Sequence, residues 1–307
     1  MQRYIAGRLV QSVFTLLLVS FLVFALGRML GNPLDVMLPI EASAQMRDDA
    51  TRRLGLDKPM VVQYGLFIRD LSTGDLGTSI RTKEPVSKLL RQRLPNTVQL
   101  VAIAMAIAMV IGVPLGIFAA TRRGTVWDSL ARVFALLGQS IPTFWAGIVL
   151  ILLFSVTLEL LPVGRKEGPM HFVLPAVTMA FFGFMMAGVV RLLRASMIEV
   201  LDSEFIKFAR IKGASQTRVL WKHGLRNALI PVVTFVGFYF GILVAGSVVV
   251  EEVFAWPGLG RLAVEAVRWR DYPVIQGVVL LVSLAILASN LLVDILYAYL
   301  DPRIRYR

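Results

Sequence analysis

The 307-residue sequence predicts an all-α polytopic membrane protein with six transmembrane helices. Composition is the first reason: 57% of the residues are hydrophobic and only 17% are charged, whereas soluble proteins carry roughly 25% charged residues. The second reason is that several nearly uncharged runs reach about 20 residues, enough for a helix to cross a bilayer. The net charge of +12 therefore requires no nucleic acid partner, because membrane proteins concentrate Lys and Arg on the cytoplasmic side.

Residues 1–30 are predicted to contain the first transmembrane helix, which begins near Arg8. Its apolar run is longer than the core of a secretory signal peptide, so we interpret it as an uncleaved span. Residues 31–95 are predicted to form an external helical cap that lies on the membrane, since they hold too few large apolar residues for a core of their own. In this cap a polar helix should end at Gly55, and Pro59 suits the first turn of a second helix.

Residues 96–307 are predicted to form a core of five further transmembrane helices. These spans are expected at about 96–120, 130–158, 173–193, 228–250 and 274–300. The span at 130–158 contains Gln139, Ser140 and Pro142 near its middle, where a proline usually kinks a helix. Together with Phe144, these residues are candidates for the lining of a pathway; a kinked helix packed against its neighbours is equally compatible.

Asp294 is the only acidic residue well inside a predicted span, and Asn290 lies one turn before it on the same face. Carboxylates inside membranes often carry ions or protons, so both residues are pathway candidates. Asp294 is nevertheless only about 10 Å along the helix from the end of its span. Structural packing of this carboxylate is therefore the favoured interpretation.

The stretch Trp256, Pro257, Gly258 and Gly260 must bend sharply because it contains one proline and two glycines. It is a candidate external gate. A simple anchor at the outer membrane interface is the alternative, because tryptophans there form an aromatic belt.

Residues 196–227 form a long polar interruption between two spans, and eight basic residues against three acidic ones lie between Arg191 and Arg226. Apolar residues recur in it at the spacing of an amphipathic helix: Ile198, Leu201, Phe205, Phe208 and Ala209. Gly213 should end that helix, and a second short helix is expected at about 216–223. From spacing alone, a docking surface and a helix resting on anionic lipid remain equally open.

Charge sets the expected orientation. The two termini, the 121–132 loop and residues 191–227 together carry 16 basic and five acidic residues, so we expect them on the cytoplasmic side. The chain contains no cysteine and only two histidines, which leaves no cysteine-ligated metal site or thiol chemistry. We find no Walker A sequence, so energy from ATP would have to come from another subunit.

Several motifs, in order along the whole chain, resemble ABC importer permeases. The sequences ARIKG at 209–213 and HGLRNALIP at 223–231 resemble the EAA loop of that family, although only Ala209 of the Glu-Ala-Ala triplet is present. Four further motifs resemble those of the dipeptide/oligopeptide branch, whose relatives import glutathione and nickel. They are GLDKP at 55–59, GDLG at 74–77, FAWPGLG at 254–260 and DPR at 301–303.

The resemblance implies the type I ABC importer permease fold, in which 96–307 is the permease core and 196–227 is the cytoplasmic coupling loop. It implies a non-enzymatic subunit without catalytic residues, metal or cofactor, in a bacterial inner membrane. The implied partners are a second homologous permease, two cytoplasmic ATPases that hold ATP and Mg, and an external solute-binding protein. The residues expected to couple to an ATPase are Phe205, Lys207, Phe208, Ala209, Arg210 and Gly213.

The solute expected from the resemblance is a dipeptide or oligopeptide, with glutathione or a nickel chelate as alternatives. A stand-alone ion-coupled carrier that uses Asp294 is the alternative from another class. A carrier of that kind would depend on an ion gradient and would ignore depletion of ATP.

Overall fold

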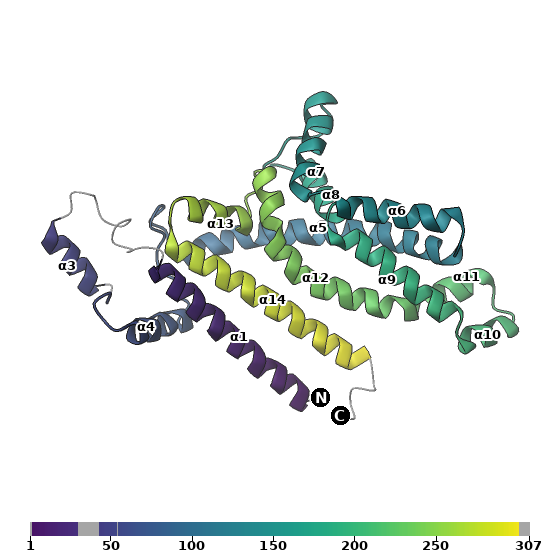
Figure 1. Cartoon of the computed structure of the whole chain (residues 1–307), viewed down its shortest axis with the longest axis horizontal. Coiled ribbons are helices and arrows are strands. Elements are labelled where there is room, and N and C mark those ends of the chain that lie inside the picture. The colour runs from purple at the N-terminus through teal and green to yellow at the C-terminus, as the bar shows by residue number, and fades with distance from the viewer. Residues whose placement is uncertain (1, 30–42, 54, 301–307) are drawn as a thin grey trace.

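The computed structural model of the protein describes residues 2–29, 43–53 and 55–300 (Figure 1). Residues 30–42 of the predicted cap and the DPR motif at 301–303 lie outside the described residues. The regular elements of the described part are helices, apart from an isolated β-bridge between Thr78 and Pro85. In order they are α1 (Gln2–Met29), α3 (Ala44–Arg53), α4 (Met60–Ser72), α5 (Val86–Thr121), α6 (Val126–Ser140), α7 (Thr143–Leu150), the π-helix η1 (Ile151–Thr157), the 3₁₀-helix η2 (Pro169–Phe172), α8 (Val173–Phe181), α9 (Phe184–Leu201), α10 (Glu204–Ile211), α11 (Gln216–Arg218), the π-helix η3 (Val219–Leu225), α12 (Arg226–Val253), α13 (Leu259–Arg268) and α14 (Tyr272–Leu300).

Within the described residues, four helical segments are long and apolar enough to cross a membrane. They are Ile5–Met29, Val86–Thr121, Gln216–Val253 and Tyr272–Ile295. Two bent pairs, Val126–Ser140 with Thr143–Thr157 and Pro169–Phe181 with Phe184–Leu201, also pass the same test of length and composition. The prediction of six spans therefore holds when each bent pair counts as one crossing.

The bends differ in origin. The first pair bends by 97°, and α7 leaves the bundle at this point (Figure 1). Ile141 is extended, with φ −96° and ψ 127°, because the residue before a proline avoids the helical region. The proline-induced kink predicted at Pro142 is thus a complete break. The second pair bends by 53° at Gly183, which is also extended; this break was not predicted.

The core lies where α5, α8, α9 and α12 meet, and small residues allow close packing there. A Cβ atom added at Gly112 of α5 would lie 2.8 Å from Val189 of α9, and one at Gly116 would lie 3.0 Å from Leu193. Helices α1 and α14 pack side by side in opposite directions (Figure 1). The start of α1 and the end of α14 therefore lie on the same side of the bundle.

The predicted cap is anchored to the transmembrane helices. The hydroxyl of Tyr64 in α4 lies 2.8 Å from the hydroxyl of Ser20 and donates a hydrogen bond to the carbonyl oxygen of Leu17 at 3.1 Å. Helix α5 runs from Val86 through Pro95 without interruption. The boundary placed at residue 95 therefore falls inside one continuous helix.

Candidate functional site

The polar interruption contains two helices rather than one. Helix α9 ends at Leu201 and α10 begins at Glu204, so the stripe from Ile198 to Ala209 is not continuous, and that prediction was wrong. Ser203 occupies the N-cap position with extended backbone angles, φ −73° and ψ 153°. Serine is among the residues preferred there, so the signal for this break was present in the sequence.

Helix α10 presents an exposed apolar ridge, formed by Phe205, Phe208 and Ile211. Their exposed fractions are 46%, 63% and 80%. Ile206 is fully buried and Ala209 is half-buried. Ile211, three residues after Phe208, was not among the predicted residues of the stripe. Ala209 was predicted to lie on the apolar face with Phe205 and Phe208, but it lies beside the exposed ridge, because its side of α10 is partly covered.

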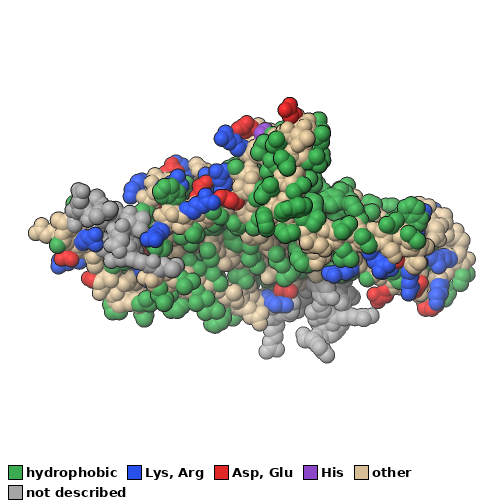
Figure 2. Space-filling model, turned by 45° about the horizontal axis from the view of Figure 1, so that its top comes forward, with side chains coloured by type: hydrophobic (Ala, Val, Ile, Leu, Met, Phe, Trp, Pro, Cys, Tyr) green, Lys and Arg blue, Asp and Glu red, His purple; other side chains and the backbone are tan. Residues whose placement is uncertain are grey.

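Positive charge surrounds this apolar ridge. Lys207, Arg210 and Lys212 are all exposed, and Lys and Arg side chains gather at the end of the molecule that holds α10 and α11 (Figure 2). The Nζ atom of Lys207 lies 2.7 Å from Oε1 of Glu204. This hydrogen bond raises the pKa of Lys207 above its ordinary value.

Gly213 ends α10 as predicted, with φ +79°, a conformation that favours glycine. Its amide donates to the carbonyl of Arg210 at 2.9 Å. The separate helix predicted at 216–223 is instead the beginning of a continuous helical segment, Gln216–Val253. Pro231 does not end this segment, since a proline removes a single helical hydrogen bond and neighbouring packing can retain the helix.

The two bends meet at a cavity of about 380 Å³. Gln139, Ser140 and Pro142 at the first bend line it, together with Gly183 at the second bend and Tyr239 of α12. Its lining residues are all uncharged. A cavity with amide and hydroxyl groups but no fixed charge can accept a hydrogen-bonding solute without selecting one sign of charge.

The other three pathway candidates do not line this cavity. Phe144 is half exposed on α7. Asp294 of α14 lies 3.1 Å from the Nε atom of Arg8 on α1, and the buried Oδ1 atom of Asn290 has no hydrogen-bond partner among the described residues. The carboxylate of Asp294 thus joins two helices by an ion pair.

The stretch predicted as an external gate is a packed turn. Trp256 is fully buried, donates from Nε1 to the carbonyl of Asn96 at 3.1 Å, and packs edge-on against Phe172. The burial of this side chain contradicts the alternative in which Trp256 is an anchor in the aromatic belt, and the role as a gate stays a prediction. Pro257 accepts a hydrogen bond from Asn96 at 2.7 Å.

The glycines of this turn are required by close contacts. A Cβ atom added at Gly258 would meet the carboxylate of Glu251, and one at Gly260 would lie 2.5 Å from the Cα atom of Val248. Glu251 is itself fully buried, so the turn wraps over a carboxylate that the sequence analysis did not single out.

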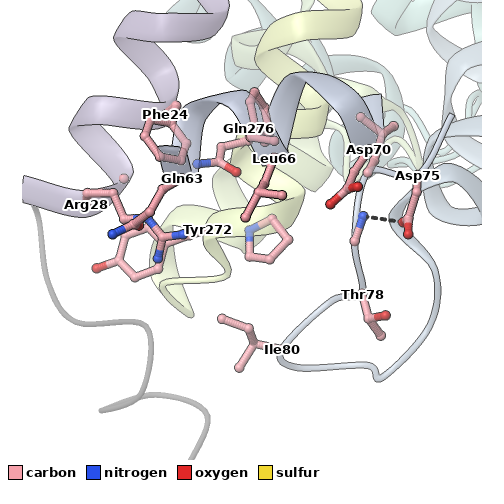
Figure 3. Close-up of a pocket in the computed structure, with 15 residues that line it drawn as sticks. Phe24, Arg28, Gln63, Leu66, Asp70, Asp75, Thr78, Ile80, Tyr272 and Gln276 are labelled. Carbon is pink, nitrogen blue, oxygen red and sulfur yellow. Dashed lines mark hydrogen bonds between the residues drawn. The ribbon is translucent and has the colours of Figure 1, made fainter. Parts of the chain in front are cut away.

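A second cavity, of about 420 Å³, lies between α1, α4 and α14 (Figure 3). Arg28 lies on one side of it and Asp70 and Asp75 lie on the other (Figure 3). The guanidinium carbon of Arg28 is 5.3 Å from the centre of the Phe24 ring. This cavity shares no lining residue with the one at the bends.

Comparison with known proteins identifies the chain. Residues 112–306 match the family described as binding-protein-dependent transport system inner membrane component. Residues 1–101 match the N-terminal family of the same membrane components. The chain belongs to this permease family. It is a permease subunit of an ABC importer and a multi-pass protein of the inner membrane, and no catalytic role of its own is indicated.

Individual relatives agree with this assignment. The glutathione transport system permease proteins GsiC of Escherichia coli strain K12 and Salmonella typhimurium strain LT2 are each 43% identical to it over 309 residues, covering both chains completely. Two inward-facing structures of the MetNI methionine ABC transporter share the fold, with TM-scores of 0.52 and 0.55 at 20% and 19% sequence identity. Each match covers 67% of this chain and 95% of the transporter chain.

Membership in the family has two consequences for the site. Permease subunits of ABC importers carry no cofactor themselves, and they work with ATPase and binding-protein subunits. Among the described residues there is no group of three or more His, Cys, Asp or Glu side chains that could hold a metal.

Proposed function

We propose that this permease imports short peptides, and that α10 is the coupling helix through which a cytoplasmic ATPase drives it. The exposed ridge of Phe205, Phe208 and Ile211 carries this proposal. An apolar ridge rimmed by cations fits a helix-in-groove contact, in which a few buried anchors supply most of the binding energy.

Short peptides also suit the cavity at the two bends. A peptide offers amide donors and acceptors and carries charges of both signs, and the uncharged polar lining of Gln139, Ser140 and Tyr239 repels neither. The relatives that are 43% identical are named for glutathione, which is itself a tripeptide, so glutathione is the first alternative solute. A nickel chelate is the second.

The proposed assembly contains a second homologous permease, two ATPases that bind ATP and Mg, and an external solute-binding protein that supplies affinity. Both termini and α10 would face the cytoplasm. The basic residues around α10 support the cytoplasmic side, and the antiparallel packing of α1 and α14 supports a common side for the start of α1 and the end of α14 (Figure 1).

Uptake by proteoliposomes tests the proposal. The complete complex with its binding protein should accumulate labelled dipeptide or glutathione with ATP, and an uncoupler should have no effect. An ATPase variant that binds but does not hydrolyse ATP should abolish uptake. Uptake that follows an ion gradient without ATP, or that is abolished by Asp294→Asn while ATP hydrolysis continues, would instead support an ion-coupled carrier.

A further inference from the structure

A buried ion pair joins α6 to α9 near α10. The Nε atom of Arg194 lies 2.6 Å from Oδ1 of Asp128, and its terminal nitrogen lies 2.6 Å from Oδ2. The amide of Gly124 also donates to Oδ2 at 3.1 Å. The side chain of Asp128 is 1% exposed and that of Arg194 is 21% exposed. The pair is therefore bidentate, with its carboxylate shielded from water and its guanidinium partly exposed.

Stability is a weak explanation for such a pair. Removing two charges from water costs several kcal/mol per ion, and apolar residues of similar volume often stabilise a protein as well or better. An apolar contact does not fix the orientation of its two partners. A bidentate guanidinium–carboxylate contact fixes both the distance and the angle between them.

The pair lies between the exposed helix α10 and the helix that leads to the cavity at the bends, so a fixed distance and angle there can link the two. Arg194 lies seven residues before the end of α9, or about 10 Å along the helix, and only Asp202 and Ser203 separate α9 from α10. Asp128 lies in the first turn of α6. The other end of α6, about 18 Å away, is Ser140, which lines the cavity at the bend.

Other contacts at this end are less specific. The ion pair between Arg123 and Asp202 has a separation of 3.3 Å, and its side chains are 64% and 72% exposed, so it contributes little. The packing of Gly112 and Gly116 against α9 is apolar and holds α9 to α5 rather than to α6.

We infer that Asp128 and Arg194 are positioning residues that make α6 move with α9, so that a displacement of α10 by the ATPase changes the bend at the cavity. The inference rests on the proposed role of α10 as the coupling helix. It adds the mechanical connection between the docking surface and the proposed pathway, across two helices that are not adjacent in sequence.

The test compares Asp128→Asn with the exchanged pair Asp128→Arg/Arg194→Asp and with Arg123→Ala as the matched control at the same end. In the reconstituted complex, Asp128→Asn should retain its ATPases and hydrolyse ATP, but the amount of solute moved per ATP should fall roughly tenfold, within the usual range of coupling between sites. Arg123→Ala should leave this ratio unchanged, and the exchanged pair should recover part of it. A parallel loss of assembly, hydrolysis and uptake, or an unchanged ratio in Asp128→Asn, would overturn the inference.

A second measurement separates this inference from the proposed solute. Because the chain contains no cysteine, single spin labels can be placed at exposed Leu137 of α6 and exposed Val233 of α12. In the wild-type complex, ATP should change the distance between the labels whether or not the chosen solute is transported, and Asp128→Asn should suppress the change. The same change in both proteins would contradict the inference, and so would no change in either.

Discussion

The two ends of the helical bundle differ in what they bury: one end buries a hydrogen-bonded carboxylate, and the other exposes an apolar ridge. At the α13 end, the buried carboxylate of Glu251 accepts hydrogen bonds from Thr97 at 2.6 Å, Ser247 at 3.0 Å and the amide of Arg261 at 3.1 Å. At the α10 end, Phe208 and the rest of the apolar ridge are exposed. The buried carboxylate of the first end has its hydrogen-bond donors within this chain, whereas the apolar ridge of the second end has no cover within the described part of this chain.

A second buried carboxylate strengthens this contrast. Asp271, next to the start of α14, is 3% exposed and accepts hydrogen bonds from the hydroxyl of Ser79 at 2.5 Å and the amide of Ile80 at 3.1 Å. It fixes the loop before α5, as Glu251 fixes the turn before α13. Loops at this end are therefore held to the transmembrane helices, and we expect movement driven by ATP to enter at the α10 end.

The largest effect should follow from removing the carboxylate at the α13 end. Glu251→Ala leaves the hydroxyl of Thr97 and the amide of Arg261 without this acceptor, whereas Ser247 can still donate to the carbonyl of Val244 at 2.9 Å. Each buried unsatisfied group costs about 1–3 kcal/mol, and the removed side chain also leaves a cavity. We expect a loss of about 3–5 kcal/mol of stability, measured as a lower unfolding temperature of the detergent-purified protein.

Glu252→Ala is the matched control for this change. Glu252 is the next residue of α12 and pairs with Arg268 at 2.6 Å, with side chains 34% and 65% exposed. An exposed pair contributes about 0–1 kcal/mol, so the unfolding temperature should barely change. If both alanine variants were equally stable, the α13 end would not be anchored by its buried carboxylate.

The next effect concerns the exposed ridge. Phe208→Ala should leave the fold intact, because the side chain is 63% exposed, but should weaken ATPase binding by about 2 kcal/mol, as expected for a hot-spot residue. Retention of the ATPase during purification measures this loss. Phe14→Ala on α1, where the side chain is 68% exposed, should retain the ATPase fully; equal retention by both variants would leave α10 as a membrane-surface helix.

Local patterns were sufficient to predict much of the fold. Uncharged runs predicted the spans, because a lipid environment imposes the same requirement along each whole helix. The break at Pro142 and the turn at Gly213 followed from backbone restrictions of single residues. The break at Gly183 was missed, since glycine within a membrane helix is common and does not by itself end it.

The missed parts of the site depend on contacts between distant segments. Nothing near Trp256 in sequence indicates that Asn96 and Phe172 bury it. Asp128 and Arg194 are 66 residues apart, so their charges were counted for orientation without being recognised as a pair. Periodicity locates one face of one helix, and it does not show which other helix covers that face.

The smallest effect should come from Gly213, where the α10 end depends on backbone conformation rather than on side-chain contacts. No atom lies within 4 Å of a Cβ added there, so an alanine fits sterically, but its φ of +79° costs about 1 kcal/mol for a residue with a side chain. Gly213→Ala should therefore lower the unfolding temperature slightly and reduce ATPase retention less than Phe208→Ala does.

Gly65→Ala provides a control of opposite sign. Gly65 lies within α4, with equally open surroundings and no positive φ. Alanine there should stabilise the helix by about 0.5–1 kcal/mol. If the two alanines shifted stability in the same direction, the left-handed turn would not define the end of α10, and the position of the ridge would have to be fixed by its contacts with η3.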